Sequence, residues 1–436
     1  MALGFIGIIL LGAVLLTLPV SSRNGDFTSF QDALFTATSA TCVTGLVVHD
    51  TATYWSNFGH LVILLLIQIG GLGFMTMASL ASFLLRRTIT LRERMVMGAG
   101  LNMTENAGIV RLTRRVLLGT LAFEGAGAVV LALRFIPLVG PARGVKMGVF
   151  HAVSAFCNAG FDLMGEPGRL YPSVTAYVSD PIVSLTLMVL VVVGGLGFFV
   201  WSDVWDKRNF KRLHLHTKLV LVTTGILLLA GFGLTLLFEW GNPSTLGQLN
   251  TGGKLLAAGF QSVTLRTAGF NTIDQAALTG PSQALGCFLM LIGGSPGSTA
   301  GGVKTVTAAI LLLSTLSALR GRTTVFAFGR AIAPRSVMNA VTMLIVGFML
   351  SLTGACAISF LEAAPFHQCL FEAVSAFATV GLSMGLTPAL GTVSHFILIA
   401  LMYLGRVGVL TLGVAVLMRR REPPKMHYPE GFVMVG

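Results

Sequence analysis

The feature that most constrains this sequence is a short apolar segment that ends in a glycine turn and occurs four times. The four turn glycines are Gly45, Gly160, Gly269 and Gly381. They are separated by 115, 109 and 112 residues. A local feature that returns at a nearly constant, long spacing indicates copies of one structural unit. We therefore expect four repeats, here called segments one to four, at 1–100, 101–212, 213–330 and 331–436.

The composition predicts a membrane protein. The chain is 54% hydrophobic and only 11% charged, which is typical of a polytopic membrane protein and not of a soluble domain. The net charge of +12 would suit a nucleic-acid binder. However, most of the Lys and Arg stand in short links between apolar runs, and no basic face carries interleaved aromatic residues. We therefore expect a lipid bilayer, and no nucleic acid, as the surroundings.

Eight apolar runs approach the length of about 20 residues that a bilayer crossing needs. They lie near 3–20, 57–85, 116–139, 182–204, 217–239, 281–319, 337–361 and 393–418. The first run could be a signal peptide, but no basic region precedes it, so we interpret it as a helix of segment one. Between the two runs of each segment lies a shorter stretch that ends at the turn glycine. The expected pore loops lie near 30–46, 145–161, 254–270 and 366–382.

The predicted fold is thus all-α, with eight spanning helices and four pore half-helices arranged with pseudo-fourfold symmetry around a pore. Basic residues set its orientation, because they collect in the links after the second, fourth and sixth runs and in the tail. Examples from the four places are Arg87, Lys211, Arg320 and Arg420. Basic links mark the cytoplasmic side. We expect both termini in the cytoplasm and half-helices that enter from outside.

A second recurring feature supports this alignment. Residues 70–74 and 194–198 both read Gly-Gly-Leu-Gly-Phe, and glycine-rich stretches stand at the equivalent places at 293–297 and 405–408. Glycine pairs are also common at tight crossings of membrane helices. The recurrence indicates common ancestry of the segments but assigns no chemistry.

The four turns have the composition of an ion-selectivity filter. Non-helical backbone inside a membrane is tolerated where it lines water, and glycine allows bends that align carbonyl groups. Rings of carbonyl oxygens replace the hydration shell of potassium in potassium channels. The expected filter residues are Cys42, Val43, Thr44, Gly45, Cys157, Asn158, Ala159, Gly160, Arg266, Thr267, Ala268, Gly269, Thr379, Val380 and Gly381. We expect potassium at the backbone carbonyls of Thr44, Ala159, Ala268 and Val380.

One such glycine alone would indicate only a loop, whereas four, each preceded by a Phe, favour a pore. The Phe residues are Phe35, Phe150, Phe260 and Phe371. The third copy departs from the others, because nine residues instead of ten separate its Phe from its glycine. We expect a shorter half-helix or a tighter turn there.

The sixth run is too long for one straight crossing and contains a stretch that cannot be a stable helix. Glycine costs about 1 kcal/mol and proline about 3 kcal/mol per helix position. We expect a flexible, hydroxyl-bearing gate just cytoplasmic of the filter, and a helix hinge without a transport role is the alternative. The loop consists of Gly293, Gly294, Ser295, Pro296, Gly297, Ser298, Thr299, Ala300, Gly301 and Gly302.

Two cationic residues, Lys304 and Arg406, stand where charge is expensive, and a third lies in a turn. Arg406 lies inside the eighth run, where we expect it to place positive charge below the filter and to position the gate loop. Lys304 follows the loop and is either part of the gate or a lysine that reaches the interface. Arg266 stands in the third turn, and we expect it to point away from the ions and brace the turn.

Other polar residues are weaker candidates. Glu124 and Glu362 lie in or at the end of first-type runs, where they could pair with backbone or an Arg. Asp162 and Asp274 follow turns two and three, where they either attract cations or simply form turns. A basic link contains His214 and His216, which are more typical of a solvated face than of a metal site. The five cysteines show neither CxxC nor metal spacing, so we expect no disulfide framework and no zinc site.

With these residues in place, the sequence resembles the Trk/Ktr/HKT superfamily of potassium transporters. The half-helix and turn pattern, Arg266-Thr-Ala-Gly-Phe270 and the 293–302 loop carry the resemblance, which covers nearly the whole chain. The start at the first repeat and a glycine-ended tail at 428–436 most resemble the bacterial KtrB-type membrane subunit. In this family a glycine in all four turns accompanies potassium selectivity, and a gate loop and an Arg at the place of Arg406 have the roles expected above.

The resemblance also implies partners and a location. It implies a homodimer on a cytoplasmic ring of nucleotide-binding, KtrA-type regulatory subunits, in the plasma (inner) membrane. The transported ion would be potassium, with sodium as a further candidate and with no organic cofactor on this chain. The chain itself carries no nucleotide motif.

Two other functions remain open at the level of the sequence. A secondary carrier of a small organic solute would use broken helices near the midplane, but it would have two inverted broken helices and not four half-helix turns. An intramembrane enzyme would need a nucleophile–base pair, HExxH or paired aspartates, none of which the sequence contains. We therefore expect no enzymatic activity.

Overall fold

The computed structural model describes residues 2–73 and 109–408, and the regular structure among these residues is almost all helix. Segment one contains α1 (Ala2–Thr17), α2 (Phe30–Cys42), α3 (Thr51–Tyr54) and α4 (Asn57–Leu72). Segment two contains α7 (Ile109–Val139), α8 (Pro141–Phe156), α9 (Pro181–Leu196) and α10 (Phe198–Lys207). Short 3₁₀ turns lie at Pro19–Ser21, Thr175–Tyr177, Phe210–Arg212 and Thr387–Ala389.

The second half of the chain repeats the same order of elements. Segment three contains α11 (Leu215–Glu239), α12 (Thr251–Thr264), α13 (Gly280–Leu291) and α14 (Thr305–Leu319). Segment four contains α15 (Pro334–Glu362), α16 (Phe366–Phe377) and α17 (Thr392–Val407). Between α14 and α15, strands β1 (Phe326–Ala327) and β2 (Arg330–Ala331) form a small antiparallel hairpin.

Three helices of the described residues are long and apolar enough to cross a membrane, namely Thr113–Val139, Leu215–Glu239 and Pro334–Glu362. The half-helices α2, α8, α12 and α16 have 13, 16, 14 and 12 residues. At 1.5 Å per residue, twelve residues span about 18 Å, which is well short of the roughly 30 Å bilayer core. These elements can therefore enter the membrane but cannot cross it. Each buries the Phe expected from the sequence, Phe35, Phe150, Phe260 or Phe371.

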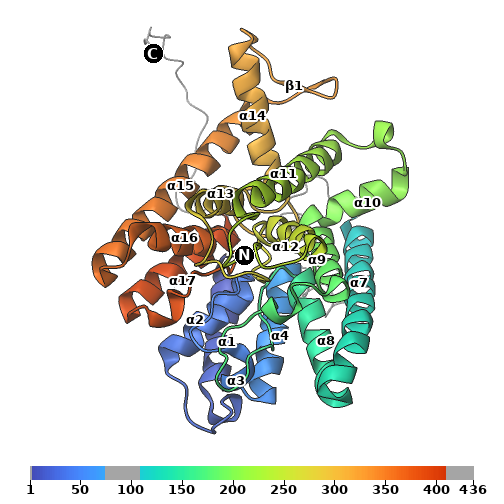
Figure 1. The fold of residues 1–436 in the computed structure, drawn as a ribbon. Helices are drawn as coiled ribbons and strands as arrows, with labels where there is room; N and C mark the ends of the chain where they lie inside the picture. Colours follow the sequence, from blue (N-terminus) through green and yellow to red (C-terminus); the bar gives the residue numbers. More distant parts are fainter. Residues whose placement is uncertain (1, 74–108, 409–436) are drawn as a thin grey trace.

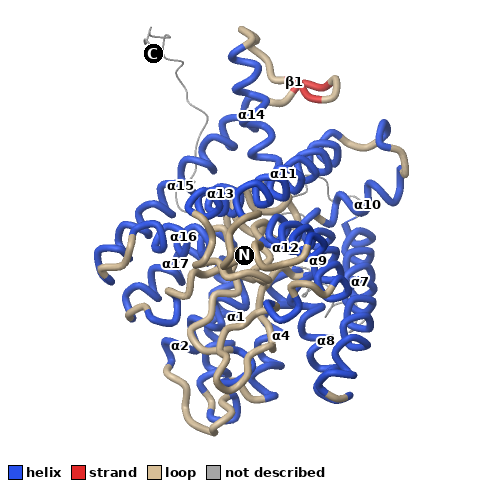
Figure 2. Tube along the Cα trace, in the orientation of Figure 1, coloured by secondary structure: helices blue, strands red, loops and turns tan. Residues whose placement is uncertain are grey.

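The helices pack in a closed cycle. Within each segment the first helix packs on the half-helix, in the pairs α1–α2, α7–α8, α11–α12 and α15–α16. The second helix of each segment also packs on the half-helix of the next, in the pairs α4–α8, α9–α12, α13–α16 and α17–α2. The last pair joins the end of the chain to its beginning. Figure 1 shows the four colour zones arranged around one centre, and Figure 2 shows loop segments gathered near the middle of the same view.

The second helices end at glycines. Helices α4, α9 and α17 end just before Gly73, Gly197 and Gly408, whose φ angles are 82°, 97° and 87°. Positive φ is a conformation that glycine adopts without strain. After Gly197 the chain continues as α10, bent by 91° from α9, so the run at 182–204 is not the uninterrupted span expected from the sequence. The sixth run is interrupted as expected, between Leu291 and Thr305. The later parts of the second and eighth runs and the tail lie outside the described residues.

Candidate functional site

The four turns share one backbone conformation. The residue two positions before each turn glycine is left-handed, with φ of 58°, 59°, 70° and 52° at Val43, Asn158, Thr267 and Thr379. The glycines themselves have φ of 97°, 70°, 83° and 90° at Gly45, Gly160, Gly269 and Gly381. A β-branched residue with positive φ is a true outlier. Three of the four left-handed residues other than glycine are Val or Thr, so the turns hold a conformation that their own sequence disfavours.

Backbone hydrogen bonds explain how the half-helices enter the turns. In turn one, the Thr44 N–H donates to the Ser39 carbonyl at 2.8 Å and the Val43 N–H donates to the Ala40 carbonyl at 3.1 Å. This pair of bonds is the Schellman helix end. Turns two and four repeat it, whereas in turn three the Ala268 N–H donates to Thr264, only four residues back, at 3.0 Å. The third turn is therefore tighter, as its missing residue predicts.

A hydroxyl group of each half-helix hydrogen-bonds to the backbone at its turn. Ser39 and Ser375 accept hydrogen bonds from the N–H groups of Gly45 and Gly381, each at 3.1 Å. In the other two turns Ser154 donates to the Phe161 carbonyl at 2.7 Å and Thr264 donates to the Phe270 carbonyl. These residues are not among the candidates that the sequence pattern indicated. The signal was present, because Ser39, Ser154 and Ser375 each stand six residues before a turn glycine.

The four turns also adjoin one another in a closed cycle. A Cβ atom added at Gly45 would overlap the Ala159 carbonyl oxygen, and one at Gly381 would overlap the Thr44 oxygen. One added at Gly160 would lie 2.9 Å from the Ala268 oxygen, and one at Gly269 would lie 2.6 Å from the Val380 oxygen. Each glycine thus faces the carbonyl that precedes the glycine of the next segment. The predicted coordinating carbonyls, Thr44, Ala159, Ala268 and Val380, are brought together.

The recurring glycines of the second helices have a steric reason. A Cβ atom at Gly70, Gly194 or Gly405 would overlap the carbonyl oxygen of Thr41, Phe156 or Phe377, respectively. These carbonyls stand four residues before the turn glycines, in the last turn of the half-helices. The glycine motif therefore lets α4, α9 and α17 press directly against the backbone that supports the first, second and fourth turns.

A further set of contacts fixes the loops that follow the turns. The residue after the buried Phe is His151, Gln261 or Glu372 in segments two, three and four. The Leu163 N–H donates to His151 Nε2 at 3.3 Å, and Gln261 exchanges hydrogen bonds with Gln275 at 2.7 and 3.1 Å. Three different side chains thus serve the same purpose at equivalent places, which is why no sequence pattern revealed them.

Glu372 makes the most of these contacts. Its carboxylate is fully buried and accepts from the Ser383 hydroxyl at 2.5 Å, the Met384 N–H at 3.0 Å and the Thr387 hydroxyl at 2.6 Å. A buried carboxylate is tolerated only with such partners.

The loop at 293–302 lies against the turns and the glycine break of α9. The N–H groups of Ser295 and Thr299 donate to the carbonyls of Gly195 and Gly194 at 3.0 and 3.3 Å, and the Phe198 N–H donates to the Gly297 carbonyl at 2.9 Å. Ser295 and Thr299 are fully buried. In this conformation hydrogen bonds connect the loop to segment two. These bonds differ from the flexible loop that the sequence led us to expect.

The basic residues contact this loop directly. Arg406 donates to the carbonyl oxygens of Thr299, Gly70 and Gly71, the last at 3.3 Å, so it joins the loop to the end of α4. Lys304 donates to the Ala300 carbonyl at 2.7 Å. Both side chains therefore stay within the protein, and the interface-reaching alternative for Lys304 is not what the structure shows.

Arg266 reaches from the third turn to the Gly293 carbonyl, 3.3 Å from its Nη2. It is 7% exposed, and its Nε has no hydrogen-bond partner among the described residues. The contact joins the third turn to the first residue of the loop.

The weaker candidates have local partners. Glu124 accepts from Gln68 at 3.1 Å, and Glu362 accepts from the Gly391 N–H at 2.9 Å. Asp162 and Asp274 accept from N–H groups two residues on, each at 2.9 Å, as turn-forming residues do. Burial also raises the pKa of the Asp162 carboxyl from 3.8 to about 7.

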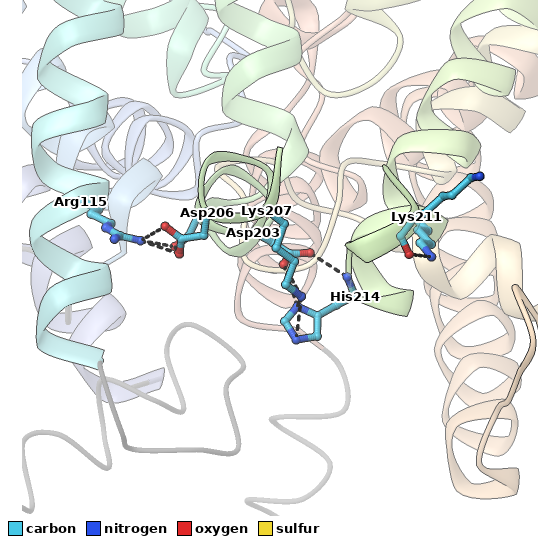
Figure 3. A network of polar contacts seen from close by, with 8 residues as sticks. Arg115, Asp203, Asp206, Lys207, Lys211 and His214 are labelled. Atoms are coloured by element: carbon cyan, nitrogen blue, oxygen red, sulfur yellow. Dashed lines mark hydrogen bonds and ion pairs between the residues drawn. The ribbon is translucent and has the colours of Figure 1, made fainter. Parts of the chain in front are cut away.

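Ion pairs that Figure 3 shows connect α10 with α7 and with the link that follows α10. His214 contacts Asp203 at 2.8 Å, Lys207 pairs with Asp203 at 2.9 Å, and Arg115 of α7 pairs with Asp206 at 2.8 Å. These contacts hold α10 in its bent position. No group of three His, Cys, Asp or Glu side chains suited to a metal occurs within 2–73 and 109–408, and all five cysteines are free there.

Comparison with known proteins agrees with this architecture. Residues 8–425 match the family TrkH, described as cation transport protein. The potassium/sodium uptake protein NtpJ of Enterococcus hirae is 41% identical over 440 residues, covering 100% of this chain and 96% of that protein. The Ktr system potassium uptake protein B of Bacillus subtilis is 41% identical over 438 residues, with the same coverage.

The fold has a solved counterpart. The potassium transporter TrkH from Vibrio parahaemolyticus superimposes with a TM-score of 0.72 at 18% identity, covering 96% of this chain and 85% of that one. The family match and the close relatives are decisive, because both extend over almost the whole sequence. The chain belongs to the TrkH family of cation transport proteins.

Proposed function

We propose that this protein is a potassium uptake transporter in which the four turns form one selectivity filter. The observation that carries the proposal is the closed cycle of turn glycines, each of which faces the carbonyl oxygen preceding the next. Two of the relatives named above are potassium uptake proteins by their printed names. A cycle of backbone oxygens suits a dehydrated monovalent cation.

The electrostatics of the turns favour the same ligand. Each half-helix directs its C-terminal end toward its turn, and that end carries roughly half a negative charge. Four such ends, together with the carbonyls of Thr44, Ala159, Ala268 and Val380, would stabilise a cation without any ionised side chain. A site of this kind binds without a formal counter-charge, so it can also release the ion.

We further propose that the loop at 293–302 is the gate, with Lys304 and Arg406 as its fixed positive charges. Arg406 supports this role, because it bonds to the loop at Thr299 and to the end of α4 at Gly70. Movement of the loop would require these bonds to break. Rearrangement of α10, which bonds to the loop through Phe198 and Gly297, could provide the link to the cytoplasmic side.

The finer architecture belongs to the same proposal. It comprises four pseudo-symmetric repeats, eight spanning helices, a plasma-membrane location with both termini in the cytoplasm, and a homodimer on a nucleotide-binding regulatory ring. The recurring order of elements supports the repeats and the spanning helices, and the basic links support the orientation of the termini. The words "Ktr system" in a relative's name support a multi-component assembly, and the printed name of NtpJ makes sodium a second candidate ion.

Uptake of radioactive rubidium into proteoliposomes tests the proposal. We expect uptake driven by an inside-negative potential, competed by potassium more strongly than by sodium and not by an organic cation. The alternative of an organic-solute carrier would instead give solute uptake and no competition by potassium. A Gly45→Ala variant should lose uptake, whereas Gly225→Ala, in open space on α11, should retain it.

A further inference from the structure

A large cavity lies between the first turns of α4 and α8 and the loop that follows the second turn. It has a volume of about 1180 Å³ and opens on one side. Its lining includes Arg23, Arg143 and Lys146 on one hand and Leu61, Leu64 and Val149 on the other. We propose that it binds an anionic glycerophospholipid, with the phosphate among the three cations and the start of the acyl chains over the apolar residues.

The three cations converge without sufficient counter-charge. All three line the same cavity, and burial, followed by the charges of Arg143 and Arg23, lowers the pKa of the Lys146 ammonium. Arg143 meets Glu166 only at 3.7 Å, and the Arg23 guanidinium has no hydrogen-bond or ion-pair partner in the described part of the chain. Like charges brought together cost free energy, which an anion bound between them would offset.

Lys146 is held in place for such a contact. Its Nζ lies 2.6 Å from Asn57 Oδ1 and 2.9 Å from His60 Nδ1, and both partners are on α4. The lysine thus bridges the two helices that form the cavity, with a neutral amide and an imidazole as partners and no carboxylate. Its positive charge remains available to a ligand.

The depth of the cavity fits a lipid headgroup. It lies where α4 and α8 begin, which is the opposite end of these elements from the basic links. The first turns of both helices, which carry the positive ends of the helix dipoles, also border the cavity. Cations on this side run against the general bias of membrane proteins, so a ligand gives a reason for their presence.

The apolar wall distinguishes a lipid from a free anion. Leu61 is 52% exposed and Val149 is 39% exposed, and both line the cavity below the cations. A soluble phosphate would leave this wall bare, whereas acyl chains would cover it and gain hydrophobic free energy. The nearby Asp50 is already occupied by the N–H groups of Ala52, Thr53 and Tyr171.

Native mass spectrometry of the full chain tests the proposal with phosphatidylglycerol and phosphatidylcholine as probes. We expect one tightly held phosphatidylglycerol per chain. The double variant Arg23→Gln/Arg143→Gln should bind it about thirtyfold more weakly, or roughly fivefold for each cation removed. Both residues are exposed, so the variant should fold. Lys146→Gln should weaken binding and Lys146→Arg should restore it.

The matched control is Lys254→Gln. Lys254 is also in a half-helix near the membrane surface, but its Nζ donates to the Trp240 carbonyl at 2.9 Å and sits over the Trp240 ring. This variant should bind phosphatidylglycerol as the wild type does. Equal lipid binding by the double variant would overturn the proposal. Retention of phosphatidylcholine equal to that of phosphatidylglycerol would also overturn it. The same holds if inorganic phosphate raises the melting temperature as much as the lipid does, or if a second copy of the chain is cross-linked at this face. The proposal rests on the membrane orientation given under the proposed function, but its readout does not involve transport, so its failure and the failure of the proposed potassium uptake are distinguishable.

Discussion

Replacing Gly381 by Ala is the sharpest perturbation of the proposed filter. Gly381 has φ of 90°, and an added Cβ would overlap the Thr44 carbonyl oxygen and lie 2.9 Å from Gly45 Cα. Left-handed backbone costs an alanine about 1–2 kcal/mol, and overpacking costs a further 1–3 kcal/mol. The contact strikes a backbone carbonyl that should coordinate the ion, so the strain should move that oxygen.

The control separates strain from overlap. Gly385 has φ of 86°, but a Cβ there would meet nothing within 4 Å, so Gly385→Ala carries only the conformational cost. Rubidium uptake by proteoliposomes should fall at least tenfold in Gly381→Ala and change little in Gly385→Ala, because a tenfold fall corresponds to only about 1.4 kcal/mol, which the overpacking against the Thr44 carbonyl can supply. The ratio of potassium to sodium competition should also fall only in Gly381→Ala. If both variants transported alike with unchanged selectivity, the filter assignment would be refuted.

Three further predictions concern the supports of the site. Ser375→Ala leaves the Gly381 N–H without its acceptor, at a cost of about 1–3 kcal/mol. It should lower the melting temperature and weaken the preference for potassium. Ser375→Thr should retain the melting temperature and the preference of the wild type. Arg406→Gln removes charged donors from the Thr299 and Gly70 carbonyls and should raise ion flux, because the loop is released. Single-channel recording or stopped-flow flux measurement would detect the increase. Unchanged flux with unchanged concentration dependence would count against the gate. Because the pKa of Asp162 is raised, its neutral form stabilises the fold below about pH 4 and this stability is lost as the pH rises through about 7. Asp162→Asn should therefore melt higher than the wild type at pH 8 and equally at pH 4, and a constant difference across this range would exclude the titration.

A control for the selectivity readout of the serine variant is Ser298→Ala. The Ser298 hydroxyl donates to the Ser295 carbonyl at 2.7 Å and accepts from the Ala300 N–H at 3.2 Å, so both of its hydrogen bonds lie within the loop. It should leave selectivity unaltered, which would show that a lost hydroxyl alone does not disturb the filter.

The arrangement of elements could be predicted from the sequence because the patterns that indicate it are local and occur in each segment. The half-helix lengths, the tight third turn and the break after Leu291 all follow from where glycine, proline and phenylalanine stand. The family is also confirmed by its full-length relatives. The assignments of individual residues to filter and gate remain predictions.

What the sequence could not supply were the contacts between distant residues. The 91° bend at Gly197 was missed, because a Gly-Leu-Gly stretch also fits a continuous membrane helix. The bond of Arg406 to Gly70 joins residues 336 apart. The bracing by Glu372 depends on a loop whose path is set only after folding. Each of these requires the tertiary structure, since nothing in the local pattern distinguishes it from the simpler alternative.

The most direct test of the central claim is the location of the ion itself. A crystal structure of the protein in rubidium, with anomalous scattering measured at the rubidium edge, should place an ion within the cycle of the Thr44, Ala159, Ala268 and Val380 carbonyl oxygens. The account predicts an anomalous peak there that potassium displaces. A peak elsewhere in the protein, or none at this position at saturating rubidium, would contradict it.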